Sequence, residues 1–465
     1  MNRRELMLAM MATAPLAACA SVSAQTGSSA DTSGVGAILD AEMAKGTIAG
    51  LSLCVLKGDT IIASETRGMA NLAFDVPVTP ETLFHVGSVG KHCTATAIFR
   101  LAEEGKLSLD APISTYLTDI SPAWGAATPR LILHHVSGLP DYFQGFGFTA
   151  FDRPLTREGM VELTMEIPPI APPGEAFFYS NAAYTLLGYV IEEVTGQSYA
   201  DHMRSIFGAF GMPNARADDG QAVIPDRADS YEWTGTEFRR SVQMASTTSA
   251  VAAGGLLMSG MDVPEWERAL NGNAMLSSAS KAEMFTPWIY PSGRSTAYCC
   301  GWREDTLDGE DVFYHHTGWV PDFPTYHLRQ PSSDISLMLM TTGLTDVLSL
   351  GLRVAESITP GSTSFSLSPV ADEHPDMTES MLAAFTRPDA IDPALLAPEM
   401  SVLPEMVQDY FVPRLEGVPD AFEVVQDTKT GADHYRRYRV TENGEVSHYM
   451  ANYDGEGRIS FVRKS

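Results

Sequence analysis

The segment Ser88-Val-Gly-Lys91 lies between a strand-like run at 82–87 and a helix-like run at 92–105, which predicts a strand–turn–helix unit. If Ser88 opens the helix, Lys91 lies three residues later on the same helical face, where its amine can reach the serine hydroxyl. A serine hydroxyl is a weak nucleophile until a neighbouring base takes its proton, and a buried lysine with a lowered pKa can be that base. We therefore interpret Ser88 and Lys91 as a candidate nucleophile and base.

Taken alone, the Ser-x-x-Lys pattern is weak, because a serine that caps a helix and an exposed lysine would give the same letters. Two other motifs are excluded by neighbouring residues. A nucleophile elbow would need glycine at the position of Val86. A phosphate-binding P-loop would need glycine at the position of His85.

Two further motifs follow along the chain, Tyr179-Ser-Asn181 and His316-Thr-Gly318. The three motifs stand in the order S-x-x-K, Y-x-N and H-x-G, and on them the sequence resembles the serine β-lactamase and penicillin-binding-protein superfamily. The resemblance is strongest to its class C β-lactamase-related branch, which includes D-alanyl-D-alanine carboxypeptidases, D-aminopeptidases and family VIII esterases. It extends over about residues 33–355 and includes connecting segments at 78–84, 105–110, 133–141, 254–259 and 318–324.

The resemblance implies an α+β fold with a β-lactamase/transpeptidase-like antiparallel sheet, flanking helices and a helical subdomain. Strand-like patterns near both ends of residues 25–358 agree with a single such sheet, and the active site is expected between the sheet and the helical subdomain. We expect a helix at 33–45, strands at 51–56, 60–64, 296–303, 312–317, 325–329 and 335–341, and a helix- and loop-rich middle at 108–245.

The resemblance also implies roles for the catalytic residues. Ser88 would attack an acyl carbonyl, Lys91 would accept or orient its proton, and Tyr179 would pass that proton to the leaving group. Water would then hydrolyse the acyl-enzyme, so no metal or cofactor is required. Without the resemblance, Tyr179 would be read as an ordinary aromatic residue at a helix entry.

Substrate-binding positions follow in the same way. The backbone N–H groups of Ser88 and Trp319 would hold the oxyanion, and Asn181 would bind the acyl side of the substrate. The remaining positions of this site are His316, Thr317 and Gly318. The alternative from local pattern alone is that Asn181 caps a helix and that Thr317 and Gly318 end a strand.

His316 stands where β-lactamases and many related peptidases have lysine. Lysine is a permanent cation that faces a substrate carboxylate, whereas histidine is mostly neutral at pH 7. The resemblance therefore favours a serine hydrolase that acts on an ester, a lactone or a small D-amino-acid amide. The alternatives are a D-alanyl-D-alanine carboxypeptidase acting on peptidoglycan-derived stems, a weak β-lactamase, or a catalytically silent binding or sensing module with the same fold.

Composition agrees with a globular protein. The chain has 465 residues, 44% of them hydrophobic, which is enough for a large core, and its net charge of −27 argues against nucleic acid as a partner. The five cysteines are too few for a disulfide framework in a chain of this length, and none forms a C-x-x-C pair. Cys299 and Cys300 should point to opposite faces of a strand, and His134 and His135 should pack against a helix, so we expect no zinc site there.

The N-terminal residues 1–24 read as a signal peptide, with Arg3-Arg4 followed by an apolar stretch at 6–16. Cleavage after Ala24 is one reading, and a lipoprotein signal that makes Cys19 the first, lipidated residue is the other. Either one predicts export, most simply to a bacterial periplasm, with membrane contact only through a lipid at Cys19. The sequence does not specify an oligomeric state.

A Ser-, Thr- and Pro-rich segment at 359–376 reads as a linker. Residues 377–465 follow as a small α+β domain, and the order of its elements suggests an NTF2-like fold. Asn443-Gly444 is a strong hairpin turn signal. We expect helices at 378–385 and 393–410 and strands at 422–426, 434–441, 445–453 and 458–463.

Overall fold

The computed structural model of the chain describes residues 32–142, 156–218, 222–241, 251–307, 311–361, 368–405, 408, 412, 414, 415, 417–430, 433–442 and 444–464. The predicted signal segment with Cys19 lies outside the described residues, as does Asn443 of the predicted hairpin turn. Within the described ranges, no helix combines the length and the apolar character that a membrane span requires.

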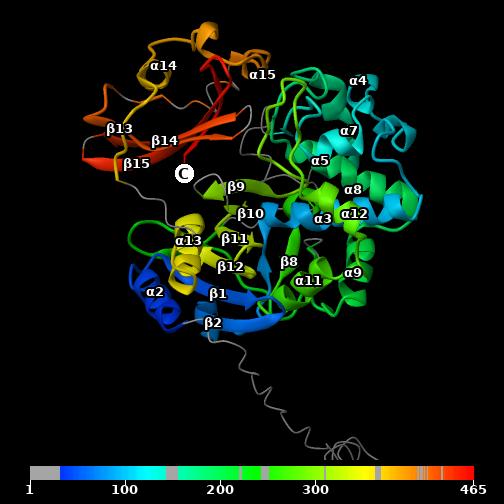
Figure 1. Ribbon diagram of the computed structural model, residues 1–465. Coiled ribbons are helices and arrows are strands. Elements are labelled where there is room, and N and C mark those ends of the chain that lie inside the picture. Colours follow the sequence, from blue (N-terminus) through cyan, green and yellow to red (C-terminus); the bar gives the residue numbers. More distant parts are fainter. Residues whose placement is uncertain are drawn as a thin grey trace, which may run out of the picture. The chain divides into compact units, whose positions relative to one another are not determined.

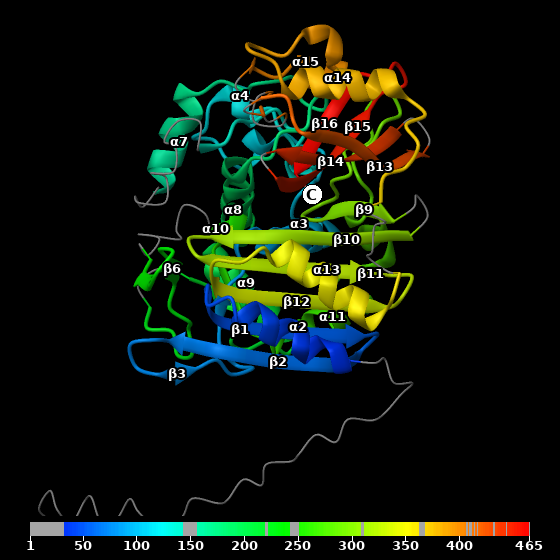
Figure 2. The ribbon, with the colours of Figure 1, turned by 90° about the vertical axis from the view of Figure 1, so that its left-hand side faces the viewer.

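The largest sheet among the described residues has seven strands in the order β3-β2-β1-β12-β11-β10-β9, and every neighbouring pair is antiparallel (Figure 2). An N-terminal hairpin joins strands from much later in the sequence, because β1 pairs with β12. This confirms the predicted fold class. The strands are β1 (Ile48–Lys57), β2 (Thr60–Asn71), β3 (Val76–Pro77), β9 (Arg303–Leu307), β10 (Asp311–Val320), β11 (Phe323–Gln330) and β12 (Ile335–Gly343).

Helices cover both faces of this sheet (Figure 1). On one face, α2 (Ser33–Met43) and α13 (Val347–Ile358) pack against each other and against the sheet, and on the other α11 (Asp262–Asn271) contacts β1 and β12. The close approach of α13 depends on Gly351, since a Cβ there would lie 2.2 Å from the ring of Tyr326. This double cover explains why β1 is buried along almost its entire length.

The helical subdomain is centred on α3 (Lys91–Glu103), which is buried on nearly all sides and packs against α8 (Asn181–Thr195). The strand-like run before Ser88 forms only the two-residue strand β4 (Phe84–His85), which pairs with β8 (Leu256–Met258). The other described helices of this part are α4 (Pro122–Gly125), α5 (Pro129–Leu133), α7 (Arg157–Glu166), α9 (Tyr199–Ala209), α10 (Val251–Gly254) and α12 (Ser278–Met284).

The strand predicted at 296–303 is wrong. This segment bends, and β9 starts only at Arg303. Ala297 and Gly301 have φ angles of +51° and +81°, which an extended strand does not tolerate. Cys299 and Cys300 are therefore not on opposite faces of a strand; both are buried free thiols in the bend, as Cys54 and Cys93 are elsewhere.

The C-terminal part contains a separate four-stranded antiparallel sheet, with β13 (Ala421–Thr430), β14 (Asp433–Glu442), β15 (Glu445–Tyr453) and β16 (Ile459–Lys464) in sequence order. Helix α14 (Pro375–Phe385) starts within the segment predicted as a linker. The single helix expected at 393–410 does not form, because prolines interrupt it. Among the described residues there, the 3₁₀ turn η5 (Pro393–Leu395) and the short helix α15 (Pro398–Ser401) are separate elements, and Glu405 and Gln408 are helical after a further break.

Candidate active site

Ser88 lies in a 3₁₀ turn, η1 (Gly87–Gly90), directly before α3. It therefore does not open the α-helix itself; Lys91 does. The two side chains still meet, with Lys91 Nζ 3.2 Å from Ser88 Oγ, because residues three apart overlie one another in a 3₁₀ turn. Ser88 is half-buried, whereas Lys91 is fully buried.

Two glycines allow the turn of Ser88 to lie directly against β10. Gly87 has a φ angle of +52°, and a Cβ at this position would lie 2.6 Å from Trp319 N. A Cβ on Gly318 would lie 2.0 Å from Val86 O. Neither position accepts a larger residue without movement of the backbone.

The edge of β10 is available for this contact. In the described strands, β9 pairs with β10 only from Asp311 to His315, and the rest of β10 meets η1 instead. The backbone of Ser88 thus adjoins the backbone that leads to Trp319, and these are the two residues whose N–H groups the sequence assigns to the oxyanion. Backbone donors fixed in this way require little reorganisation during a reaction.

The hydrogen-bond partners of Lys91 determine where the lone pair of its amine points. Nζ donates to Asn181 Oδ1 at 2.7 Å and to Ala253 O at 2.6 Å. A neutral amine has two N–H groups and one lone pair, so with both N–H groups on these acceptors the lone pair is left for the Ser88 hydroxyl. This is the arrangement that a base for Ser88 needs.

Burial lowers the pKa of Lys91 to about 7. The carboxylate of Asp141 opposes this effect, while the guanidinium of Arg303 adds to it. A lysine with a pKa near neutrality is uncharged in a large fraction of molecules at pH 7, and such shifts are typical of functional sites.

Asp141 fixes the orientation of Asn181. Its Oδ2 accepts hydrogen bonds from Asn181 Nδ2 at 2.8 Å and from Asn181 N at 2.9 Å. The amide oxygen of Asn181 therefore turns toward Lys91. The family resemblance implied contact of Asn181 with the substrate and no role for Asp141, although Asp141 ends the matching segment 133–141. Ser180, not Asn181, caps α8.

The ring of Tyr179 lies beside the lysine. Lys91 Nζ lies 4.8 Å from the centre of its ring, and the His135 ring lies 4.2 Å from it, centre to centre. The nitrogen Nδ1 of His135 accepts a hydrogen bond from Ser180 N at 3.1 Å, which fixes the residue directly after Tyr179. His135 thus supports the Tyr179 segment in addition to packing in the helical subdomain. The neighbouring His134 is buried against Tyr298 O.

His316 is 2% exposed, and both of its ring nitrogens contact the protein. Because a carbonyl can only accept, Nδ1 carries the proton that it shares with Thr317 O at 2.6 Å, and Nε2 accepts from the Tyr298 hydroxyl at 3.1 Å. Burial, with the positive charges of Arg303 and Lys91, holds the pKa of His316 well below its usual range. It is a neutral residue whose contact with a substrate would be indirect.

Arg303, at the start of β9, was not singled out in the sequence. Its guanidinium carbon lies 5.9 Å from the ring centre of Tyr179 and 5.5 Å from that of Tyr298. It adds a positive charge to the site where His316 carries none. No role was assigned to it from the sequence, because it was only the last residue of the strand expected at 296–303. The described side chains around Ser88 contain no group of three metal-ligating atoms.

The chain is similar in sequence and in structure to known proteins. A family model described as Beta-lactamase matches residues 35–354. Penicillin-binding protein 4* of Bacillus subtilis (strain 168) is 27% identical over 290 residues, which cover 59% of this chain and 63% of that protein. The chain spans less than two thirds of the length of this and other curated relatives that it matches.

Two solved structures are also similar. D-amino acid amidase from Ochrobactrum anthropi SV3, complexed with L-phenylalanine, is 27% identical, with a TM-score of 0.59 over 70% of this chain and 97% of that chain. The octameric penicillin-binding protein homologue from Pyrococcus abyssi is 21% identical, with a TM-score of 0.62 over 93% of this chain and 100% of that chain. The second likeness concerns the fold alone.

Proposed function

Because the chain belongs to the Beta-lactamase family, as its three motifs predicted, we propose that it is a serine hydrolase that forms an acyl-enzyme at Ser88. Its substrate is an ester, a lactone or a small D-amino-acid amide. The observation that carries the proposal is the contact of 3.2 Å between Ser88 Oγ and Lys91 Nζ, with the two N–H groups of a neutral amine directed at Asn181 and Ala253.

In the first half of the reaction, the Lys91 amine takes the proton of Ser88 as Oγ bonds to the acyl carbon. The carbonyl oxygen gains a negative charge, which the backbone N–H groups of Ser88 and Trp319 stabilise. When the tetrahedral intermediate collapses, the bond to the leaving group breaks, and Tyr179 delivers a proton to it and regains one from Lys91. In the second half, Lys91 and Tyr179 take a proton from water as its oxygen adds to the acyl carbon. The bond between the acyl carbon and Oγ then breaks, the acid leaves, and the proton taken from water passes to Ser88 Oγ.

The neutral state of His316 supports substrates that lack a free carboxylate next to the scissile bond. Its Nε2 and Nδ1 contact Tyr298 and Thr317, so this residue offers no charge to such a carboxylate. The likeness to a D-amino acid amidase, at 27% identity, supports a D-amino-acid amide as one member of the substrate class.

A second candidate function is a D-alanyl-D-alanine carboxypeptidase, and Arg303 favours it. Its guanidinium lies beside the Tyr179 ring and supplies the permanent cation that a terminal carboxylate would require. The likeness to a penicillin-binding protein supports the same candidate. In this case Arg303, and not His316, takes the place of the lysine found in β-lactamases.

We also propose that the protein is exported and meets its substrate in a periplasm. The support is the sequence alone, with Arg3-Arg4 and the apolar run at 6–16. The mass of the mature protein recovered from cells tests this, since processing after Ala24 and lipidation at Cys19 give different masses.

Three substrates separate the candidates: a p-nitrophenyl ester of a short acid, a D-alanine anilide, and a peptide that ends in D-Ala-D-Ala. We expect the purified chain to hydrolyse the ester and the anilide faster than it releases terminal D-alanine, and Ser88→Ala to lose all of this turnover. Preferential release of D-alanine would favour the carboxypeptidase. If no substrate is turned over, or Ser88→Ala is equally active, the hydrolase proposal is wrong and a binding module remains.

A further inference from the structure

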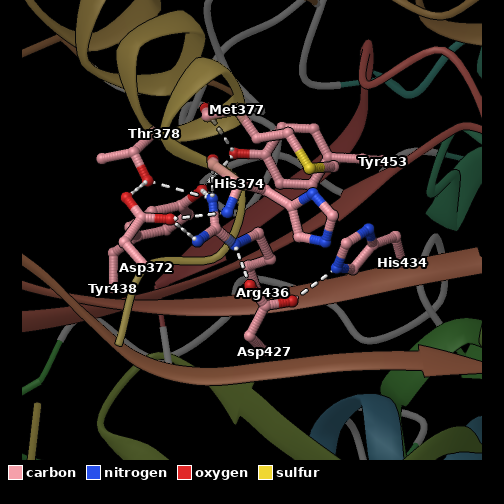
Figure 3. A network of polar contacts seen from close by, with 9 residues as sticks. All are labelled: Asp372, His374, Met377, Thr378, Asp427, His434, Arg436, Tyr438 and Tyr453. Carbon is pink, nitrogen blue, oxygen red and sulfur yellow. Dashed lines mark hydrogen bonds and ion pairs between the residues drawn. The ribbon is translucent and has the colours of Figure 1, made fainter. Parts of the chain in front are cut away.

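A group of potential metal ligands lies in the C-terminal part of the chain, apart from the residues around Ser88. In the portion of the chain that the structure describes, His374, Asp427 and His434 each offer one ligand atom, and these atoms all lie within 4.8 Å of one another. Figure 3 shows the two imidazole rings and the carboxylate converging from three segments. We propose that these side chains bind a divalent transition-metal ion, with Zn²⁺ as the best fit.

The register of the C-terminal sheet explains why two of the ligands lie together. Asp427 of β13 pairs with Arg436 of β14, and Lys429 pairs with His434. Residues two apart on a strand share a face, so His434, Arg436 and Asp427 all project to the same side of the sheet. His374 comes from outside the sheet, where it directly precedes α14.

Arg436 contacts both His374 and Asp427 and fixes them relative to each other. This fully buried arginine contacts Asp427 Oδ2 through Nε at 3.0 Å and donates from Nη1 to His374 O at 2.9 Å. The other oxygen of the carboxylate, Oδ1, contacts His434 Nε2. A carboxylate ligand whose second oxygen is fixed by a neighbouring group is a common feature of metal sites.

A wider network anchors this arginine (Figure 3). Arg436 also contacts Asp372 Oδ1 at 2.5 Å, and Asp372 Oδ2 accepts from Thr378 Oγ1 at 2.7 Å. The start of α14 is thereby tied to the sheet before any ion binds. The backbone of His374 and the second oxygen of Asp427 are held by contacts that do not use the proposed ligand atoms, while the ring of His374 is left to move toward an ion.

The group is accessible. A pocket of about 540 Å³ is lined by all three ligands and by Glu373 and Lys429. His374 is exposed, Asp427 is half-buried and His434 is 8% exposed, so an ion can enter from the side of His374. The carboxylates of Asp372, Asp427 and Glu373 outnumber the cations of Arg436 and Lys429, which leaves the charge favourable for a cation.

The chemical types of the three ligand groups indicate which metal ion would bind. Two imidazoles and one carboxylate suit Zn²⁺ and similar ions, whereas Mg²⁺ and Ca²⁺ prefer oxygen ligands alone. Tetrahedral zinc with bonds of about 2.0–2.2 Å keeps its ligand atoms about 3.4 Å apart. His374, the exposed member, therefore has to close on Asp427 and His434, and the fourth position is left for water or Glu373. The ion would tie the start of α14 to the β13–β14 hairpin.

The test uses the full-length chain without an affinity tag, stripped of metal with a chelator and then titrated with Zn²⁺ by calorimetry. We expect one ion per chain and a higher melting temperature with Zn²⁺. His374→Ala, a change at an exposed residue, should weaken Zn²⁺ binding at least about 10-fold and abolish the thermal shift. His434→Gln is the second variant and should weaken Zn²⁺ binding in the same way. The absorption spectrum of bound Co²⁺ reports whether the coordination is tetrahedral.

His448→Ala is the matched control. His448 lies in the same sheet and pairs with Arg439, which projects to the face opposite Arg436. It should bind Zn²⁺ as the unchanged chain does. The proposal is overturned if the unchanged chain shows no saturable binding, if His374→Ala and His434→Gln bind as tightly as it does, or if His448→Ala loses binding to the same degree. In that case His434 and Asp427 form only an ion pair.

Discussion

Asn181 Oδ1 accepts a hydrogen bond from Lys91 Nζ at 2.7 Å, and Asp141 fixes this orientation by binding the amide nitrogen of Asn181 at 2.8 Å. The chain of contacts from Asp141 to Ser88 therefore determines how the lysine presents its lone pair. It also couples the charge of Asp141 to the protonation of Lys91. Asp141 raises the pKa of Lys91, so its replacement should shift the pH dependence of the activity. A residue with a purely structural role would leave the pH dependence unchanged.

Removal of the amine should abolish most of the activity. Lys91→Met keeps a long apolar side chain in the buried position but leaves Ser88 without a base, so kcat/KM should fall by about 10²–10⁴. Ester hydrolysis at pH 8 measures this. Lys106→Met, at an exposed lysine that pairs with Glu104, should retain full activity. Turnover by Lys91→Met within about threefold of the unchanged chain would remove the lysine from the chemistry.

The pH dependence should follow the protonation of Lys91. Since the pKa of this lysine is about 7 and the neutral amine is the base, kcat/KM should rise through pH 7 and fall about tenfold per pH unit below it. The acid limb of a pH–rate profile, recorded from pH 5 to 9 with an ester of constant charge, gives this pKa. An acid limb centred near pH 4 would instead indicate a carboxylate as the base.

Asp141→Asn should move that limb to lower pH. The carboxylate raises the pKa of Lys91, so its neutral replacement leaves the lysine easier to deprotonate. The maximal rate should fall as well, because the amide of the variant offers Asn181 one uncharged acceptor oxygen in place of the carboxylate that orients it. Asp110→Asn, which removes a carboxylate paired with Arg130 on the surface, is the control and should leave the limb unchanged. A shift to higher pH would contradict the electrostatic account.

Arg303→Gln should move the limb in the opposite direction. The guanidinium lowers the pKa of Lys91, so its removal raises that pKa and displaces the acid limb to higher pH. If the carboxypeptidase is the true function, the same variant should also raise KM for a peptide with a free terminal carboxylate and leave KM for an ester unchanged. Arg239→Gln, at an exposed arginine of β7 (Phe238–Arg240), should alter neither quantity.

Gly318→Ala should displace the backbone N–H groups that are assigned to the oxyanion, and it should leave every titrating group unchanged. The added Cβ would lie 2.0 Å from Val86 O and force the turn of Ser88 away from β10. We expect a loss of about 10²-fold or more in kcat, with an unchanged acid limb. Gly208→Ala is the control, since a Cβ on this residue of α9 meets nothing within 4 Å. Equal activity of the two variants would contradict the assigned role of Trp319 N–H.

Local sequence was sufficient for the parts of the site that depend on short spacing. The three-residue separation of Ser88 and Lys91 predicted their contact, even though a 3₁₀ turn replaces the expected α-helical start. Apolar and alternating runs predicted most strands of the large sheet. The strand predicted at 296–303 was wrong because its residues favour strands, whereas the chain bends at Ala297 and Gly301, and Gly301 lies directly against the start of α3.

Residues that act through tertiary contacts could not be found in this way. Asp141 and Arg303 lie far from Ser88 in the sequence, and their effect on Lys91 exists only once the subdomains have packed. His374, Asp427 and His434 likewise form a group only because strand register and the start of α14 bring them together. No spacing rule for metal ligands joins residues so widely separated in the sequence.

The site of covalent modification tests most directly whether Ser88 is the nucleophile. The purified chain is mixed with a slowly hydrolysed ester, quenched in acid during turnover, and examined by intact mass and then by peptide mapping. We expect one acyl group per chain, located on Ser88, absent from Ser88→Ala and formed much more slowly in Lys91→Met. An adduct on another residue, or one of equal yield in Ser88→Ala, would contradict it.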